Sequence, residues 1–260
     1  MDFFSLTMAD LYRAMLVMFR TGAVMMSVPV FGHASIPRRL RVWFVMLIAY
    51  LIIPVSFVIE TDLPRTLVGL AVVILTEIAI GFLLGFAVMT VFAAVQFAGH
   101  IIGLQMGLAV ANIVDPMGAG QISIIGEYYY LFSLVIFLLI NGHHIVINAI
   151  VRSFEMIPLG GAVFGEPVQA MVIDFAFGVF VFGIKLAAPV LITLFITNAV
   201  LGIVARTVPQ MNVFIVGFPL AIGVGLALIG ISFPAFYMLI NKMFNGLERD
   251  FAVIITTLAR

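Results

Sequence analysis

Three charged residues, Arg20, Glu77 and Lys185, each interrupt an otherwise apolar stretch of the sequence. Charged side chains are rare and costly in lipid, so we expect these three to face protein or water. Glu77 could then form an ion pair with either Lys185 or Arg20. The alternative is that each charge lies at a helix end, close to the lipid headgroups. Both interpretations stay open at the level of sequence.

The remaining polar residues do not form a pattern typical of a catalytic or metal site. His143 and His144 are adjacent, and neighbours on a helix point about 100° apart, so they are poorly placed to share a metal ion. Ser232 lies in Gly-Ile-Ser-Phe, which lacks the second glycine of a nucleophile elbow. Cysteine is absent, and there is no Walker-type phosphate loop. We therefore predict no enzymatic activity, no metal and no cofactor.

The composition excludes a soluble globular enzyme. Of the 260 residues, 64% are hydrophobic and 9% are charged, whereas soluble domains have about 45–50% and about 25%. Twelve basic and twelve acidic residues give a formal net charge of zero, so nucleic acid is not an expected partner. The sequence indicates an integral membrane protein.

Charge-free windows divide the chain into six hydrophobic segments. A bilayer core about 30 Å thick requires about 20 apolar residues in a helix, and continuous rather than alternating apolar runs favour helices over barrel strands. We predict an all-α membrane protein with about six long, partly kinked helices. They are expected roughly at residues 9–31, 40–59, 66–108, 122–151, 168–205 and 211–241.

The third and fifth predicted helices are much longer than one membrane span. A straight helix of about 40 residues reaches about 60 Å, so each must protrude, bend back or lie inside a larger protein body. Prolines within or beside the hydrophobic runs are expected to kink the helices. They are Pro29, Pro54, Pro189, Pro219 and Pro234.

Small residues recur at every fourth position, which lets helix backbones approach closely in a membrane. The positions are Gly81 and Gly85, followed by Gly99, Gly103, Gly107 and Ala111. We interpret the second series as a helix-packing face, with a moving seam as the alternative.

Residues 110–123 (VANIVDPMGAGQIS) form the only long break in the middle of the chain. Asp115-Pro116 starts a turn, and the following glycines loosen it. A loop this apolar between long helices is expected to be buried, which at membrane depth requires surrounding protein or a cavity.

Residues 242–260 are predicted to form a separate amphipathic tail. Leu247, Phe251, Ile254 and Leu258 recur at helical spacing with charges between them. Such a helix lies on a membrane surface or docks on a partner.

Four stretches resemble the FliR family of flagellar biosynthetic proteins, which is related to the SctT family of injectisomes. They run in order from about residue 20 to 235, at the family's spacing. The stretches are Pro29-Val30-Phe31 with Ile36-Pro37 and a basic group, Gly103–Leu108 continuing to Val114-Asp115-Pro116, Asn141-Gly142-His143 with Pro158-Leu159-Gly160, and Ala205–Leu220.

The resemblance implies a core component of the type III export gate. In that family FliR joins FliP and FliQ in a closed helical assembly around a protein-conducting pore that exports flagellar subunits across the bacterial inner membrane. FlhB wraps its cytoplasmic side and FlhA supplies the adjacent machinery of the basal body. The expected partners are these subunits, unfolded substrates in transit and membrane lipid. A virulence-type injectisome gate and an autonomous transporter or channel remain alternatives.

The resemblance also assigns parts of the chain. Residues 1–165, with the central loop 109–121, would form a FliP-like part, and 166–260 a FliQ-like hairpin with the amphipathic tail. The family's pore-plugging loop would correspond to Val110, Ala111, Asn112, Ile113, Val114, Asp115, Pro116, Met117 and Gly118. Many relatives have phenylalanine where this chain has Val110 and Ile113, so Met117 and aliphatic residues would have to seal the pore.

The hairpin tip is a candidate contact for FlhB. It comprises Arg206, Pro209, Gln210 and Asn212. The alternative is that Pro209 simply ends a helix while Arg206 anchors that helix among the headgroups.

Overall fold

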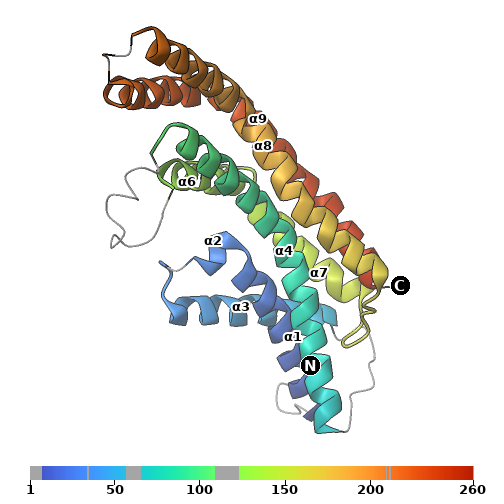
Figure 1. Ribbon diagram of the computed structural model, residues 1–260. Helices are drawn as coiled ribbons and strands as arrows, with labels where there is room; N and C mark the ends of the chain where they lie inside the picture. Colours follow the sequence, from blue (N-terminus) through green and yellow to red (C-terminus); the bar gives the residue numbers. More distant parts are fainter. Residues whose placement is uncertain are drawn as a thin grey trace. The chain divides into compact units, whose positions relative to one another are not determined.

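All regular secondary structure in the described part of the protein is helical. The computed structural model describes residues 8–33, 35–56, 66–108, 123–208, 210 and 212–259, and no strand occurs among them. Their helices, labelled in Figure 1, are α1 (Met8–Ser27), α2 (Pro29–Gly32), α3 (Arg38–Ser56), α4 (Leu67–Gln105), α6 (Ile124–Leu139), α7 (Gly142–Met156), α8 (Glu166–Thr207) and α9 (Val213–Leu258). The prediction of an all-α membrane protein is confirmed, although the number of helices differs because two predicted helices are broken.

The first break separates α1 from α2. Val28 has extended backbone angles (φ −74°, ψ 121°), and Pro29 is the first residue of α2. Proline suits this position, because the first residues of a helix have no intrahelical acceptor for an N–H group. Pro29 therefore ends the first predicted helix and does not merely kink it.

The second break lies at Asn141, between α6 and α7. Asn141 has a left-handed backbone (φ 58°) and is followed by Gly142, where α7 begins. The axes of α6 and α7 differ by 67°. Asn and Gly are the residues that most readily adopt such turns, so the predicted fourth helix is a bent pair.

Among the residues that the structure describes, three helices are long and apolar enough to cross a membrane, or four if the bent α6–α7 pair counts as one span. They are α4 with 39 residues, α8 with 42, and α9, of which the 44 residues Ile215–Leu258 qualify. Pro189 lies inside α8, and Pro219 and Pro234 lie inside α9, without ending either helix. The predicted overlong third and fifth helices are thus present in the structure.

The C-terminal tail is not a separate element, contrary to the prediction, because α9 continues without interruption to Leu258. Its predicted apolar face is nevertheless buried, with Leu247, Phe251, Ile254 and Leu258 at most 3% exposed. The Val163 N–H donates to the Leu258 carbonyl at 3.0 Å. The amphipathic face therefore docks on its own chain.

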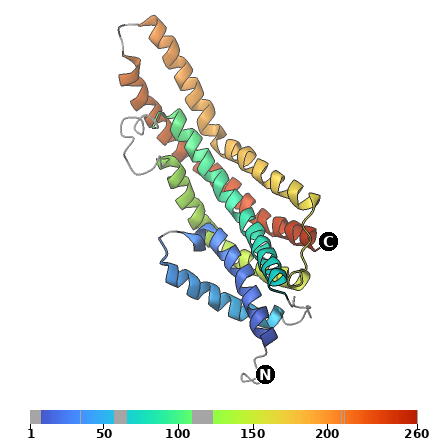
Figure 2. The same ribbon diagram turned by 60° about the horizontal axis from the view of Figure 1, so that its bottom comes forward.

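The chain divides into two compact units. The first comprises Met1–Thr90, Asn141–Phe175 and Phe244–Arg260, and the second comprises Val91–Ile140 and Ala176–Met243. Within the first unit, α1 packs on α3, as both views show (Figures 1 and 2). Each unit combines segments from both sides of residue 165, so it does not correspond to the predicted FliP-like and FliQ-like parts. That division stays a prediction.

Glycines permit close helix contacts within each unit. A Cβ atom added to Gly81 of α4 would overlap the Arg20 carbonyl oxygen of α1, and one added to Gly85 would overlap Ser27. In the second unit, an added Cβ at Gly99 would lie 2.5 Å from Cα of Gly126 in α6. These positions have no room for a larger side chain.

The close α1–α4 contact predicts a stability difference between two glycine variants. Gly81→Ala should lower the stability of the purified protein by about 1–3 kcal/mol, because overpacking forces the helices apart. Gly230→Ala in α9 is the matched control, since its added Cβ meets nothing within 4 Å and alanine is the better helix former. Thermal unfolding in detergent would measure both variants, and equal midpoints would contradict the contact.

Candidate functional site

The first unit contains an ion pair between Arg20 of α1 and Glu77 of α4. Both residues are fully buried. Arg20 Nε donates to Glu77 Oε2 at 2.6 Å, and the Arg20 Nη2 atom donates to Glu77 Oε1 at 3.1 Å. Two parallel hydrogen bonds between a guanidinium and a carboxylate fix the orientation of both groups.

The rest of the guanidinium binds the C-terminal end of α7. Arg20 Nη1 donates to the Ser153 carbonyl at 2.8 Å, and both terminal nitrogens lie 3.3 Å from the Ile157 carbonyl oxygen. The last carbonyls of a helix have no intrahelical donor and carry partial negative charge, so a cation is stabilised there. The Arg20 Cζ atom also lies 4.2 Å from the ring centroid of Phe154, at cation–π distance.

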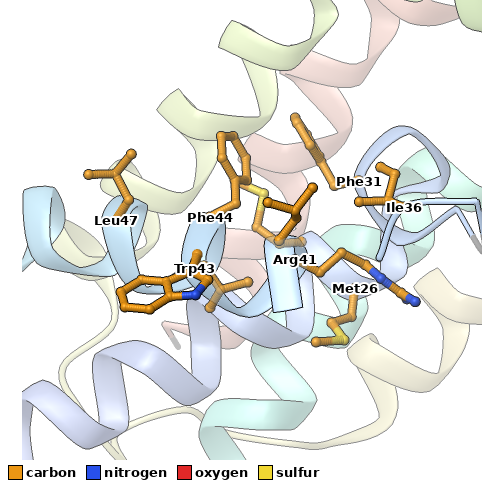
Figure 3. A pocket seen from close by; sticks show the side chains of 10 residues that line it. Met26, Phe31, Ile36, Arg41, Trp43, Phe44 and Leu47 are labelled. Carbon is orange, nitrogen blue, oxygen red and sulfur yellow. The ribbon is translucent and has the colours of Figure 1, made fainter. Parts of the chain in front are cut away.

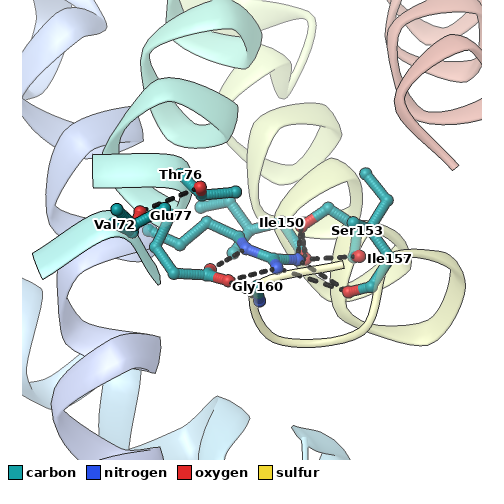
Figure 4. Close-up of polar contacts among 8 residues, drawn as sticks. Val72, Thr76, Glu77, Ile150, Ser153, Ile157 and Gly160 are labelled. Atoms are coloured by element: carbon teal, nitrogen blue, oxygen red, sulfur yellow. Dashed lines mark hydrogen bonds and ion pairs between the residues drawn. The ribbon is translucent and has the colours of Figure 1, made fainter. Parts of the chain in front are cut away.

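Gly160 completes the coordination of the carboxylate. Its backbone N–H donates to Glu77 Oε1 at 2.8 Å, and Figure 4 shows Glu77 directed toward Gly160, Ser153 and Ile157. Gly160 has φ +72°, and an added Cβ would also lie 3.1 Å from Val73 Cγ2. Only glycine adopts this conformation readily. The turn formed by Pro158-Leu159-Gly160 thereby directs a backbone N–H to the Glu77 carboxylate.

This polar cluster connects α1, α4 and the end of α7. None of the charged atoms of Arg20 and Glu77 is left without a partner for use in catalysis. Each guanidinium nitrogen and each carboxylate oxygen has a partner within α1, α4, or the end of α7 and the turn after it. Among the described residues, no group of three or more side chains could hold a metal ion. The rings of His143 and His144 lie 4.4 Å apart at the start of α7, edge to face.

Of the three predicted intramembrane charges, the structure pairs Arg20 with Glu77 and leaves Lys185 elsewhere. Lys185 is exposed on α8, in the second unit, and its Nζ lies 5.4 Å from the ring centroid of Phe182. It forms no ion pair with the residues that the structure describes.

The predicted helix-packing face does not continue as one regular surface. Gly99 and Gly103 lie in α4, and an added Cβ at Gly103 would lie 3.3 Å from Ser123 Oγ. Gly107 lies in the turn after α4 with φ +82°, and an added Cβ there would be 2.5 Å from the Phe218 ring. Ala111 lies outside the described residues, as does the whole predicted plug loop, Val110–Gly118.

The predicted hairpin tip coincides with the connection between α8 and α9. Arg206 is in the last turn of α8, and Gln210 and Asn212 follow it; all three are exposed. Pro209 lies outside the described residues.

Sequence analysis missed Ser153, Ile157 and Gly160 as parts of the polar cluster. Ser153 and Ile157 contribute backbone carbonyls and Gly160 a backbone N–H, which residue type does not predict; Ser153 Oγ also accepts from Arg20 Nη1, at 3.4 Å. In the sequence, Pro158-Leu159-Gly160 carries only the resemblance to the family pattern.

Comparison with known proteins gives a consistent result over nearly the whole chain. The sequence model of a family described as "Bacterial export proteins, family 1" matches residues 11–247. The flagellar biosynthetic protein FliR of Bacillus subtilis (strain 168) is 34% identical over 243 residues, covering 91% of this chain and 92% of that protein. FliR of Escherichia coli (strain K12) is 31% identical, covering 93% and 92%. FliR of Caulobacter vibrioides is 30% identical, covering 93% and 96%. These relatives are named as export or biosynthetic components and not as enzymes.

The buried ion pair predicts a large effect of removing one partner. Arg20→Met should lower stability by about 3–5 kcal/mol, because Glu77 is left buried without a counter-charge. The double variant Arg20→Met/Glu77→Leu should recover part of that loss, since no charge then remains in the interior. Chemical denaturation of the detergent-solubilised protein would measure both.

The control is Arg249→Met. Arg249 pairs with Asp250 at 3.6 Å, but its side chain is 84% exposed, and such surface pairs contribute about 0–1 kcal/mol. A double variant as unstable as Arg20→Met would show that the unpaired carboxylate is not the cause.

Proposed function

Because the chain belongs to the FliR family of flagellar biosynthetic proteins, we propose that it is a core subunit of the flagellar type III export gate. It is a membrane protein of the export apparatus, and we place it in the inner membrane, at the flagellar basal body. Together with FliP-type and FliQ-type subunits it would form the pore through which unfolded flagellar subunits pass. Family membership over nearly the whole chain is the observation that carries this proposal.

The lengths and surfaces of the helices support an assembled state. The contour of α8, with 42 residues, is about 60 Å long, roughly twice the thickness of a bilayer core. Large apolar side chains along it are more than half exposed, including Phe177, Ile192 and Phe195. Lipid can cover only part of such a helix, so the remainder requires apolar surfaces of other subunits.

The loop between α4 and α6 is our candidate for the pore plug. Its two ends come from helices in close contact, since an added Cβ at Gly99 would lie 2.5 Å from Gly126 Cα. Ser123 fixes the second end, because its Oγ accepts from the Gly126 N–H at 3.1 Å and donates to the Gly99 carbonyl at 3.4 Å. The two ends of the candidate plug are therefore fixed to one close helix pair.

In the proposed mechanism, the resting loop fills the lumen and retracts when an unfolded substrate enters. Val110–Gly118 includes Met117 and several aliphatic residues but no phenylalanine. Methionine and aliphatic side chains can exclude water and ions without a fixed packing geometry. The exposed tip at Arg206, Gln210 and Asn212 is our candidate contact for FlhB, and FlhA would be the neighbouring partner.

The assembly proposal predicts a mixed complex. Co-expression of the tagged protein with FliP-type and FliQ-type subunits of the same organism should yield one stable particle containing all three, because the exposed apolar surfaces require partners. Native mass spectrometry of the detergent-purified material would identify its subunits. A homogeneous particle formed equally well without partners would favour an autonomous transporter or channel. Assembly only with the subunits of a virulence-type system would favour an injectisome gate.

The plug proposal predicts ion leakage after loop replacement. Exchanging Val110–Gly118 for a short Gly/Ser linker in the assembled complex should raise the conductance of planar bilayers, because the apolar seal is lost. Arg249→Gln is the control, since it changes an exposed side chain outside both the loop and the tip, and it should leave conductance at the wild-type level. Unchanged conductance in a fully assembled linker variant would refute the plug assignment.

A further inference from the structure

The first unit contains an apolar groove beside α1, α2 and the N-terminal half of α3. It encloses about 580 Å³. Figure 3 shows its side chains, among them Met26, Phe31, Ile36, Trp43, Phe44 and Leu47. The lining contains one charged residue, Arg41, whose guanidinium lies toward one edge of the set, while Trp43 and Leu47 lie toward the other.

The charged end of the groove has an excess of positive charge. Arg38, Arg39 and Arg41 occupy the first turn of α3, and this turn contains no acidic residue. None of the three forms an ion pair with the described part of the chain. Helix N-termini already carry partial positive charge and usually have acidic residues. The arrangement therefore favours an anion from outside the chain.

Arg41 connects the charged end to the apolar groove. Its Nη1 donates to the Gly32 carbonyl at 3.3 Å, while its Nε is buried and has no hydrogen-bond partner. A buried donor without an acceptor is unfavourable. Arg41 as a whole is only half-buried, so the rest of its guanidinium can meet an anion at the mouth of the groove.

An apolar stripe extends from the charged end along α3. Leu40, Trp43, Leu47 and Leu51 follow one another at helical spacing and are 59%, 68%, 55% and 62% exposed. From Leu40 to Leu51 the helix rises about 16 Å, close to half of a bilayer core about 30 Å thick. The stripe thus matches the depth of one lipid leaflet, and Trp43 near its charged end is typical of the headgroup region.

We propose that this groove binds an anionic phospholipid, with the phosphate among Arg38, Arg39 and Arg41 and an acyl chain along the groove toward Leu47. Positive charge at one end only, followed by an apolar surface one leaflet long, fits a molecule with an anionic head and an apolar tail. A basic cluster next to an apolar helix surface at the membrane is a general physical basis for selecting anionic lipids. The inference depends on the membrane location of the chain and not on the proposed pore.

The sequence supplies its own probe, because Trp43 is the only tryptophan of the protein. The full chain would be reconstituted into phosphatidylcholine vesicles containing a minor fraction of phospholipid with brominated acyl chains, which quench indole fluorescence on contact. The brominated lipid would carry either a phosphatidylglycerol or a phosphatidylcholine headgroup on identical chains. We expect the phosphatidylglycerol form to be enriched at Trp43 about fivefold over the phosphatidylcholine form. This ratio corresponds to a difference of about 1 kcal/mol in binding free energy.

Charge variants test the role of the arginines. The triple variant R38Q/R39Q/R41Q should quench equally with both lipids, whereas R38K/R39K/R41K, which keeps the charge, should retain the preference for phosphatidylglycerol. R249Q removes an exposed arginine elsewhere and should also retain it. Loss of the preference in the glutamine variant alone supports the site.

Two results would overturn the proposal. The first is equal quenching by the two brominated lipids in the wild-type protein. The second is protection of Trp43 from both lipids once FliP-type and FliQ-type subunits are bound, which would show that a protein partner and not a lipid occupies the groove.

Discussion

The ion pair between Arg20 and Glu77 determines how the segments of the first unit meet. A buried charge is tolerated only if nearly every donor and acceptor around it is satisfied, and here that requires α1, α4 and the end of α7 at fixed positions. The same requirement explains two glycines. Gly81 lets α4 approach the backbone of α1 at Arg20, and Gly160 adopts the left-handed turn that directs its N–H to the carboxylate.

The pair also accounts for the sharp turn after α7. The carbonyls of Ser153, in the last turn of α7, and of Ile157, directly after it, both accept donors from outside the helix; the Ser153 carbonyl also accepts from the Ile157 N–H at 3.0 Å. The guanidinium supplies those donors without water, which a membrane interior does not provide. One arginine therefore neutralises a carboxylate and caps a helix at the same time, and a lysine could not reproduce this because it lacks the planar fork of donors.

The long helices could be predicted from the sequence because continuous apolar residues are a local property of the chain. The windows that predicted helices at 66–108 and 168–205 depend only on continuous apolar sequence, and α4 and α8 lie there. At Pro29 the prediction was a kink, and none was made for a break at Asn141, since proline and asparagine can kink or end a helix depending on their neighbours. The tail was predicted as separate because its charges changed the composition, yet a helix can continue from an apolar to an amphipathic segment without any break.

The pairing of the charges was not determined by the sequence, because Arg20 and Glu77 are 57 residues apart and Arg20 and Ser153 are 133 residues apart. The sequence allowed Glu77 to pair with either Arg20 or Lys185, and only packing distinguishes these two. The cluster itself includes backbone atoms of Ile157 and Gly160; the glycine indicates a turn, but residue type does not show which side chain the backbone atoms bind.

Arg20 and Lys185 are the two basic residues within apolar stretches, and they differ in whether their charge is compensated within this chain. Arg20 is fully buried and its charge is compensated within the chain. Lys185 is exposed on a helix whose neighbouring side chains are apolar, and it pairs with no described residue. A cation in such a position needs water, a headgroup or a carboxylate from another molecule. The first unit therefore contains a buried ion pair satisfied within the chain, whereas α8 presents both an apolar surface and a charge that other molecules must complete, as expected for one subunit of a larger membrane assembly.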